Sequence, residues 1–340
     1  MTHLNLFCTR SSCHGVPIVS PITGTRQRLV IAAFAVVCVV WGSTYYGIRV
    51  AVSGYPPFTL GAARFLLAGS VLLAVARLRG EALPRPREWA SALLTGSLFF
   101  VVGNGLVNVA EQSVSSGLAS VLVATMPLWV TLFGRLFGVR VSGAELAGVV
   151  LGLLGVMVLN LGGDLRASPG GATCALLAPM GWAMGSVASA RLPLPRGMMR
   201  TAAQMICGGA AMAAVSLAAG EHFVQAPSWQ ASVALLYLCV FGSLLGFSAY
   251  SYLLANARPA VATSYAYVNP VIAVVLGVAL LGERFGTTSL LGAVIVLAAV
   301  VVVGRAAQSR ASASRSRSMV AVASCSGSKR STGPESSTTT

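Results

Sequence analysis

The sequence predicts an all-α membrane protein with ten transmembrane helices, built as two inverted five-helix repeats. Three observations predict this fold: the composition of the chain, a series of apolar segments of membrane-spanning length, and landmarks that recur between its two halves. The 340 residues are 56% hydrophobic and only 9% charged, whereas a water-soluble domain has about 25% charged residues to solvate its surface. The lipid bilayer is therefore the first partner that we expect.

Apolar segments follow one another along the chain, and each approaches the ~20 residues that a helix needs to cross the hydrocarbon core. We expect every segment to be helical, because a helix pairs its backbone polar groups internally. Proline-rich stretches such as Pro56-Pro57 separate the segments, since proline removes a backbone donor. The ten segments are residues 29–49, 58–76, 89–110, 116–137, 144–161, 170–190, 199–219, 229–254, 260–281 and 287–304.

The net charge of +15 would suggest nucleic-acid binding in a soluble protein. Here the basic residues lie between apolar segments, so they predict orientation and no nucleic-acid partner is expected. With the N-terminus in the cytoplasm, only four of the 23 basic residues fall on the opposite side: Arg49, Arg64, Arg166 and Arg284. The positive-inside rule thus predicts a multi-pass protein of the cell inner (plasma) membrane with both termini cytoplasmic.

The two ends of the chain differ in composition from the apolar segments. Residues 1–28 are polar and mixed, and we expect a cytoplasmic N-terminal arm. Residues 305–340 are rich in Ser and Thr with scattered Arg, and we expect a disordered cytoplasmic tail. The seven cysteines form no C-x-x-C pattern, so neither a disulfide framework nor a metal site is expected. No cofactor is predicted.

The second half of the chain repeats landmarks of the first half at a nearly constant offset. The offset is 141 residues for Trp41 and Trp182, and 143 for Pro127 and Pro270. Chance matching in an apolar sequence is the alternative, and the paired Trp and Pro residues argue against it. Each half, residues 29–165 and 170–304, holds five segments. Because five is odd, the second half enters the membrane from the opposite side, an arrangement that suits alternating access.

Two prolines mark the predicted transport site. Pro127 and Pro270 lie near the middle of the fourth and ninth segments, where we expect helix breaks. Proline removes one helix hydrogen bond, and backbone groups freed at the midplane cannot face lipid. Paired interrupted segments in the two halves of a transporter point to its central site. We therefore expect both segments to meet a cavity close to the pseudo-two-fold axis.

The predicted substrate-binding residues are polar or aromatic residues within the segments. Asn104, Asn108 and Glu111 are spaced i, i+4 and i+7, which places them on one face of a regular helix. The other candidates offer apolar rings with a few hydroxyl and amide groups, as an amphipathic solute requires: Trp41, Tyr45, Trp182, Ser186, Tyr250, Tyr265 and Asn269. The alternative is that these groups only join helices by hydrogen bonds and ring packing.

Three charged residues in the outer part of the bundle need separate interpretation. Arg49 and Arg64 are expected near the outer ends of the first two helices, where Arg64 can extend its side chain towards the outer surface. Contact with lipid headgroups is the expected role, and capture of a carboxylate at the outer mouth is the alternative. Glu111 is the one carboxylate expected within the membrane protein, near the outer end of its helix. No midplane carboxylate relay is visible, so proton coupling, exchange and facilitated diffusion all stay open.

The apolar motifs resemble a known family in their order and spacing. Four of them are WGSTYYGIRVAVSGYPPFTLGAARFLLAG, GNGLVNVAE, VATMPLW and SYAYVNPVIAVVLG. Together they resemble the EamA family of the drug/metabolite transporter superfamily over about residues 30–304. The resemblance implies a ten-helix exporter or facilitator for amino acids, metabolites or drug-like compounds, and it does not fix the solute.

The function predicted from these observations is transport of small metabolites, namely amino acids or related amphipathic solutes, by alternating access. Two alternatives stay open: a drug or toxic-compound efflux protein of the same fold, and a non-transporting membrane assembly or receptor protein. An enzyme is not expected, because His3, His14 and His222 all lie outside the segments and no general base is apparent within them. A small-molecule substrate is the expected partner, and a homodimer is left open.

Overall fold

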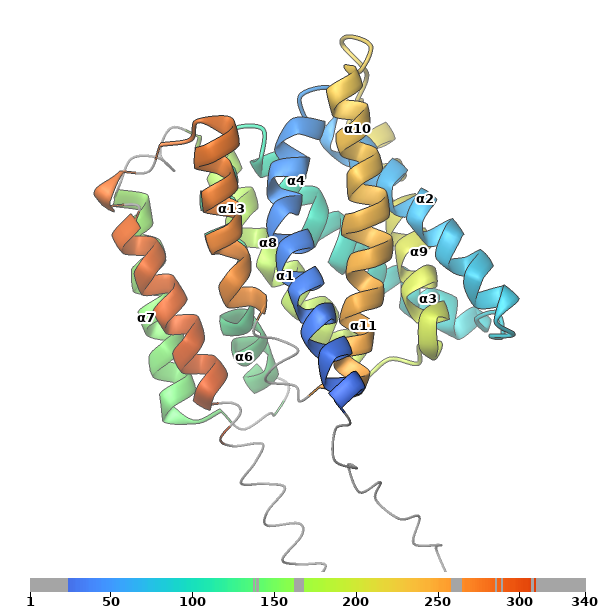
Figure 1. Ribbon diagram of the computed structural model, residues 1–340, viewed down its shortest axis with the longest axis horizontal. Helices are drawn as coiled ribbons and strands as arrows, with labels where there is room; N and C mark the ends of the chain where they lie inside the picture. The colour runs from blue at the N-terminus through green and yellow to red at the C-terminus, as the bar shows by residue number, and fades with distance from the viewer. Residues whose placement is uncertain are drawn as a thin grey trace, which may run out of the picture.

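The structure is a computed structural model that describes residues 24–136, 138, 141–161, 168–257, 265–284, 286–288, 290–306 and 309. Within these ranges all regular structure is helical, and the helices stand side by side in a bundle (Figure 1). The first residues of α1 (Gly24–Ala51) and the end of the last helix lie at the same end of the bundle (Figure 1). Most of the predicted N-terminal arm and C-terminal tail lies outside the described residues.

The helices follow the predicted segments closely. In the first half, α1 is followed by α2 (Pro57–Leu78), α3 (Pro86–Gly96), the π-helical η1 (Ser97–Gly105), α4 (Leu106–Ala110), α5 (Ser116–Val123), α6 (Met126–Leu136) and α7 (Gly143–Leu161). The second half contains α8 (Pro169–Ser189), α9 (Gly197–Ala218), α10 (Trp229–Tyr237), the π-helical η2 (Leu238–Leu245), α11 (Gly246–Asn256), α13 (Tyr265–Leu281) and a helix over Leu290–Ala306.

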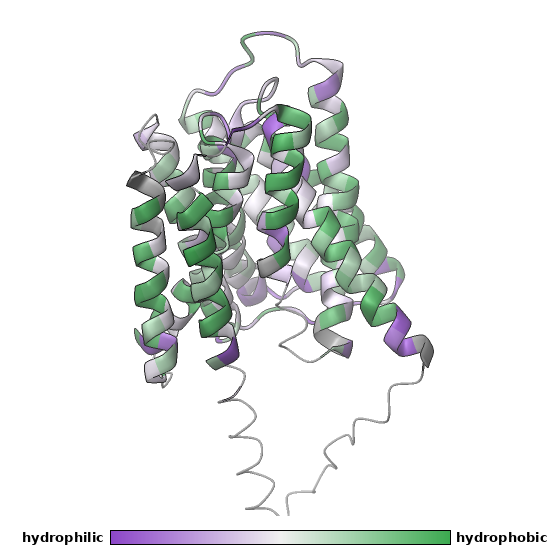
Figure 2. Ribbon diagram, turned by 60° about the vertical axis from the view of Figure 1, so that its left-hand side comes forward, coloured by the Kyte–Doolittle hydropathy of each residue, from purple (hydrophilic) through white to green (hydrophobic). Residues whose placement is uncertain are grey.

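Among the described residues, seven helices are long and apolar enough to cross a membrane, and three shorter apolar helices accompany them. Large apolar side chains such as Leu67, Val71 and Leu217 are exposed on the outside of the bundle, and Figure 2 shows hydrophobic residues along the outer faces of the helices. Such a surface is stable in lipid and costly in water. The prediction of an all-helical membrane chain is thereby confirmed, whereas ten spans in two inverted repeats stay a prediction.

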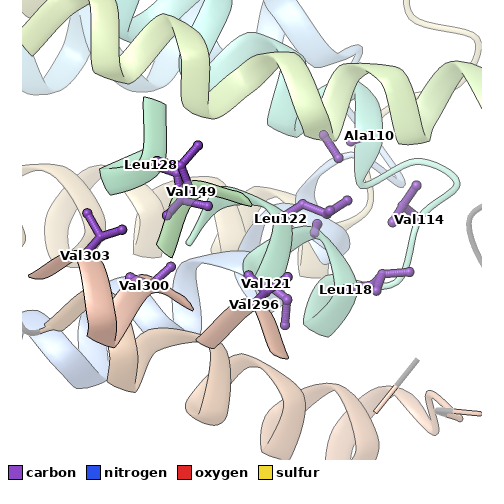
Figure 3. Close-up of a cluster of buried hydrophobic side chains, with 12 residues drawn as sticks. Ala110, Val114, Leu118, Val121, Leu122, Leu128, Val149, Val296, Val300 and Val303 are labelled. Atoms are coloured by element: carbon purple, nitrogen blue, oxygen red, sulfur yellow. The ribbon is translucent and has the colours of Figure 1, made fainter. Parts of the chain in front are cut away.

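The apolar core joins the two halves of the chain. One cluster brings Leu122 of α5 and Leu128 of α6 against Val149 of α7 and against Val296 and Val300 of the last helix (Figure 3). All five side chains are buried. Their packing fixes the interrupted fourth segment against helices from both halves of the chain.

The helix of the fourth predicted segment is interrupted near its middle, whereas the described helix of the ninth segment is continuous. α5 ends at Val123 and α6 begins at Met126, so the chain leaves the helix at Ala124 and Thr125, just before Pro127. α13 instead runs through Pro270 without interruption, which differs from the expected break. Neighbouring helices can re-satisfy the carbonyl that a proline frees, so a membrane helix tolerates proline within it.

Gly-Glu pairs tie helices of one half to helices of the other half. Gly80 and Gly220 have φ angles of +81° and +66°, a left-handed conformation that glycine adopts without strain, and they end α2 and α9. Glu81 then accepts hydrogen bonds from the amides of Met198 (3.3 Å) and Met199 (2.8 Å) at the start of α9.

Glu221 makes the reciprocal contact, since it accepts from the amides of Phe58 (3.0 Å) and Thr59 (2.8 Å) at the start of α2. Carboxylates are stabilising at helix N-termini, because they satisfy free amides and complement the helix dipole. The antiparallel helices α2 and α9 are therefore clamped together at both ends.

Close backbone contact between α3 and α9 gives a first prediction. A methyl group added at Gly208 would lie 2.6 Å from the carbonyl oxygen of Gly96. Because backbone cannot move aside as a side chain can, Gly208→Ala is expected to cost about 1–3 kcal/mol of stability. Thermal unfolding of purified protein measures this loss. Gly170→Ala is the control, since no atom lies within 4 Å of the added methyl group; equal stability of the two variants would contradict the prediction.

Candidate functional site

A continuous internal space runs from one end of the bundle to its middle. An inner pocket of about 100 Å³ adjoins a vestibule of about 980 Å³. Five residues line both spaces and so mark their junction: Trp41, Met126, Trp182, Phe247 and Tyr265. The vestibule extends to the end of the bundle where α2 ends and α9 begins, because its lining includes Arg79, Glu81 and Arg200.

Aromatic rings form one wall of this space. The ring centroid of Trp41 in α1 lies 5.3 Å from that of Phe247, 5.1 Å from that of Tyr250 and 5.0 Å from that of Tyr265. Edge and tilted ring contacts at these distances are favourable. The Trp41 indole also donates to the carbonyl of Gly242 at 3.1 Å, which fixes the ring against the π-helical η2.

Trp182 on α8 is the counterpart of Trp41 in the second half, and it packs on η1. A methyl group added at Gly103 of η1 would overlap the Trp182 indole, so the glycine allows the ring to lie directly on the helix. The Trp182 ring centroid lies 5.9 Å from that of Phe99, also in η1. Each tryptophan thus packs against the π-helical segment of the other half.

Two asparagines supply polar groups to the inner pocket. Asn104 in η1 donates its amide nitrogen to the carbonyl of Phe99 at 3.0 Å. With its amide turned to the orientation that satisfies both groups, Asn269 in α13 donates its amide nitrogen to the carbonyls of Tyr265 (3.1 Å) and Cys38 (3.2 Å). The printed bond of Asn104 uses one of the two N–H groups of its amide, and the side-chain oxygens of Asn104 and Asn269 can accept hydrogen bonds.

The structure places the predicted site residues in three groups. Trp41, Tyr45, Asn104, Trp182, Tyr265, Asn269 and Pro270 line the inner pocket, and Ser186 and Tyr250 line the vestibule. Asn108 and Glu111 line neither space: Asn108 donates to the carbonyl of Pro57 at 2.9 Å, and Glu111 is fully buried. Pro127 lies in α6, whose first turn contributes Met126 to the pocket.

Arg64 lines the inner pocket, deeper than the outer mouth at which the sequence analysis placed it. It was expected to extend towards the outer surface, but it is 5% exposed, and its Nε donates to Ser243 of η2 at 2.9 Å. The physical reason is that α2 packs against η2, which covers the route outward. An ionisable residue two turns inside a predicted span is itself a signal for a functional site, and that signal was available in the sequence.

The end of the bundle opposite the vestibule is closed by polar contacts. Glu283, after α13, accepts hydrogen bonds from the amide and the hydroxyl of Ser116 at 2.7 and 2.9 Å and from the amide of Gly117 at 3.3 Å. A guanidinium nitrogen of Arg49 donates to the backbone carbonyl of Glu111. None of the residues 111–115 and 282–284 lines the pocket or the vestibule.

This bundle defines an integral membrane protein that encloses a solute-sized space between its two halves. The chain belongs to the EamA-like transporter family, which matches residues 28–161 and 169–305. It is therefore a transmembrane transporter of the EamA type, and the resemblance stated from the sequence is confirmed. The family matches twice along the chain, once in each half.

Two related transporters and one solved structure are similar to this chain. It is 45% identical over 280 residues, 82% of this chain and 92% of that protein, to the uncharacterized inner membrane transporter YedA of Escherichia coli (strain K12). It is 27% identical over 275 residues, 80% of this chain and 92% of that protein, to a probable terminal-alkyne amino-acid exporter of Streptantibioticus cattleyicolor. A crystal structure that is 20% identical, covering 82% of this chain and 97% of that chain, shares the fold with a TM-score of 0.55.

Proposed function

We propose that this transporter moves amino acids or related small amphipathic solutes across the inner membrane by alternating access. The observation that carries the proposal is the internal space, which is open at one end of the bundle, lined by aromatic and amide groups at the middle, and closed beyond. A site that is reached from only one side at a time is what alternating access requires. The amino-acid exporter among the relatives supports this solute class.

Repeated structural features support the inverted five-helix repeats and ten spans of this proposal. The π-helical segments η1 and η2 begin 141 residues apart, the same offset as Trp41 and Trp182. The reciprocal contacts of Glu81 and Glu221 exchange the roles of α2 and α9. A two-fold axis in the membrane plane would relate these pairs.

The charges around the vestibule support its assignment to the cytoplasmic side. Arg79, Arg196 and Arg200 line its wide end, and an excess of Arg is typical of cytoplasmic loops. The structure then corresponds to the inward-open form. In this form α2 and α9 stay clamped at both ends, so opening of the outer side is assigned to α5 and α13, which Glu283 joins.

Counterflow in liposomes tests the proposed function. Purified protein is reconstituted into vesicles preloaded with one unlabelled L-amino acid, and uptake of the same labelled amino acid is followed. Accelerated uptake of at least one amino acid supports the proposal. Ethidium counterflow without any amino-acid counterflow would favour the drug-efflux alternative, and no flux of any solute would favour the assembly or receptor alternative.

Asn269→Ala gives a second prediction, because Asn269 faces the pocket and joins α13 to α1. Loss of one hydrogen bond is worth roughly 0.5–1.5 kcal/mol, so solute affinity is expected to fall between a few-fold and about ten-fold. The measurement is solute affinity at equal membrane abundance. Leu122→Val is the control, since Leu122 is buried in the apolar core and does not line the pocket. An Asn269→Ala variant that binds like the parent would remove this residue from the site.

A further inference from the structure

The inner pocket contains a buried cation without an acidic partner. Arg64 is 5% exposed and lines the pocket together with Asn104 and Asn269. Its Nε donates to Ser243 at 2.9 Å, whereas Nη1 and Nη2 make no hydrogen bond or ion pair with any residue in the described part of the chain. The Arg64 guanidinium carbon lies 4.8 Å from the ring centroid of Phe65, which offsets part of the cost of burial without supplying negative charge. A buried charge is costly unless it is paired, so this position indicates a ligand that brings negative charge.

The π-helical segment η2 holds the guanidinium in place. Ser243 fixes one edge of it, and Gly242 leaves room for the other, because a methyl group at Gly242 would lie only 3.0 Å from Nη2. The Sγ atom of Cys239 contacts the Arg64 carbonyl at 3.7 Å. A guanidinium fixed along Nε presents its remaining N–H groups as a planar fork, which matches a carboxylate.

The amide groups around Arg64 complete the charge pattern of the pocket. Asn104 and Asn269 donate from their nitrogens to backbone carbonyls, and their side-chain oxygens can accept hydrogen bonds. Among the described residues that line the inner pocket there is no carboxylate. The pocket thus offers one fixed positive charge, two amide acceptors and the apolar faces of Trp41 and Tyr265.

We propose that Arg64 binds the carboxylate of the transported solute, and that Asn104 and Asn269 accept hydrogen bonds from its ammonium group. This inference rests on the transport function proposed above and adds the group that is recognised. The pocket then selects zwitterionic amino acids with small apolar or aromatic side chains. A solute that carries only positive charge finds no counter-charge in the pocket and is repelled by Arg64.

The test compares each acid with an analogue that lacks only the carboxylate. Binding of L-alanine, L-leucine and L-phenylalanine, and of the amide of each, is measured by thermal shift. We expect the parent to bind at least one acid at least tenfold more tightly than its amide. Arg64→Gln should lose at least tenfold affinity for that acid, and Arg64→Lys, which keeps the charge without the fork, should lose less.

Two further variants separate recognition from folding. Ser243→Ala removes the bond that positions Arg64 and keeps the charge, so it should weaken acid binding a few-fold. Arg28→Gln makes the same charge change at an exposed position and should leave acid binding unchanged. Equal binding of acid and amide by the parent, binding of none of the three acids, or an Arg64→Gln variant that binds acid like the parent would each overturn the assignment.

Counterflow measured in parallel distinguishes failure of the proposed recognition site from failure of the proposed transport function. The parent protein could transport a solute and yet bind acid and amide equally well. This result would support the transport function and would show that Arg64 does not recognise the solute. Acid binding that depends on Arg64 in a protein without flux would instead support the recognition site and contradict the transport function.

Discussion

Replacing Glu283 with alanine is expected to open the closed end of the transporter. The Glu283 carboxylate accepts three hydrogen bonds from Ser116 and Gly117 at the start of α5, and all three must break when this end opens. Hydrogen bonds to a charged group are worth about 1.5–3 kcal/mol each in the folded state. When this end opens, water forms hydrogen bonds to the same groups and offsets most of that free energy. A net change of about 2 kcal/mol would shift the equilibrium roughly 30-fold toward the outward-open form.

Thiol labelling measures this shift. A cysteine is introduced at Ser120, which is 1% exposed and lines the inner pocket, in a background without the native cysteines. A membrane-impermeant maleimide added from the side opposite the vestibule should label the Glu283→Ala protein faster than the parent. Glu88→Ala is the control, because Glu88 is only half-buried and, among the described residues, accepts only from the amide of Arg85 in its own turn. Equal labelling rates in all three proteins would contradict the assigned role.

The sequence has no acidic residue at the position of the first half that corresponds to Glu283. Gly282 and Gly138 both have positive φ angles, +66° and +81°, and they end helices at equivalent places. Glu283 follows the first glycine, but Val139 follows the second, and a valine side chain cannot accept a hydrogen bond.

The positions of the helices could be predicted from the sequence because they follow from composition alone. Long apolar segments must be helical in lipid, and prolines such as Pro57 and Pro86 stand in the first turn of α2 and α3, where a missing amide is harmless. The paired tryptophans were also found, since they are large and rare enough for the repeat to be visible.

The orientation of side chains in the third segment could not be predicted, because the sequence gives no sign of the π-helical η1. Asn104, Asn108 and Glu111 share one face only if every turn is a regular α-turn. A π-helix has i→i+5 hydrogen bonds and wider turns, so η1 changes the register between Asn104 and α4. Asn104 consequently lines the pocket, while Asn108 turns to the carbonyl of Pro57.

The environment of Glu111 is the basis for a prediction about pH. Glu111 follows α4 directly, one residue beyond the membrane-length helix 86–110. Its carboxylate oxygens are buried and have no hydrogen-bond partner among the described residues. Burial, and then the nearby Glu283, raise the pKa of its carboxyl well above the ordinary value, while Arg49 opposes them. Tyr45 is the further titratable group close to it.

If transport is proton-coupled, replacing Glu111 with glutamine is accordingly expected to abolish its response to a pH gradient, while exchange remains measurable. In the closed form burial favours the protonated carboxyl, because a buried charge without a partner is costly. Opening admits water, lowers the pKa and releases the proton to the outer side, so higher outer pH favours the open form. Glutamine stays neutral throughout and removes this dependence.

Counterflow at fixed inner pH and varied outer pH measures the effect, with His222→Gln as the control at an exposed titratable group near the same end. A Glu111→Gln protein that keeps the full pH response, or a His222→Gln protein that loses it, would assign the proton to another group.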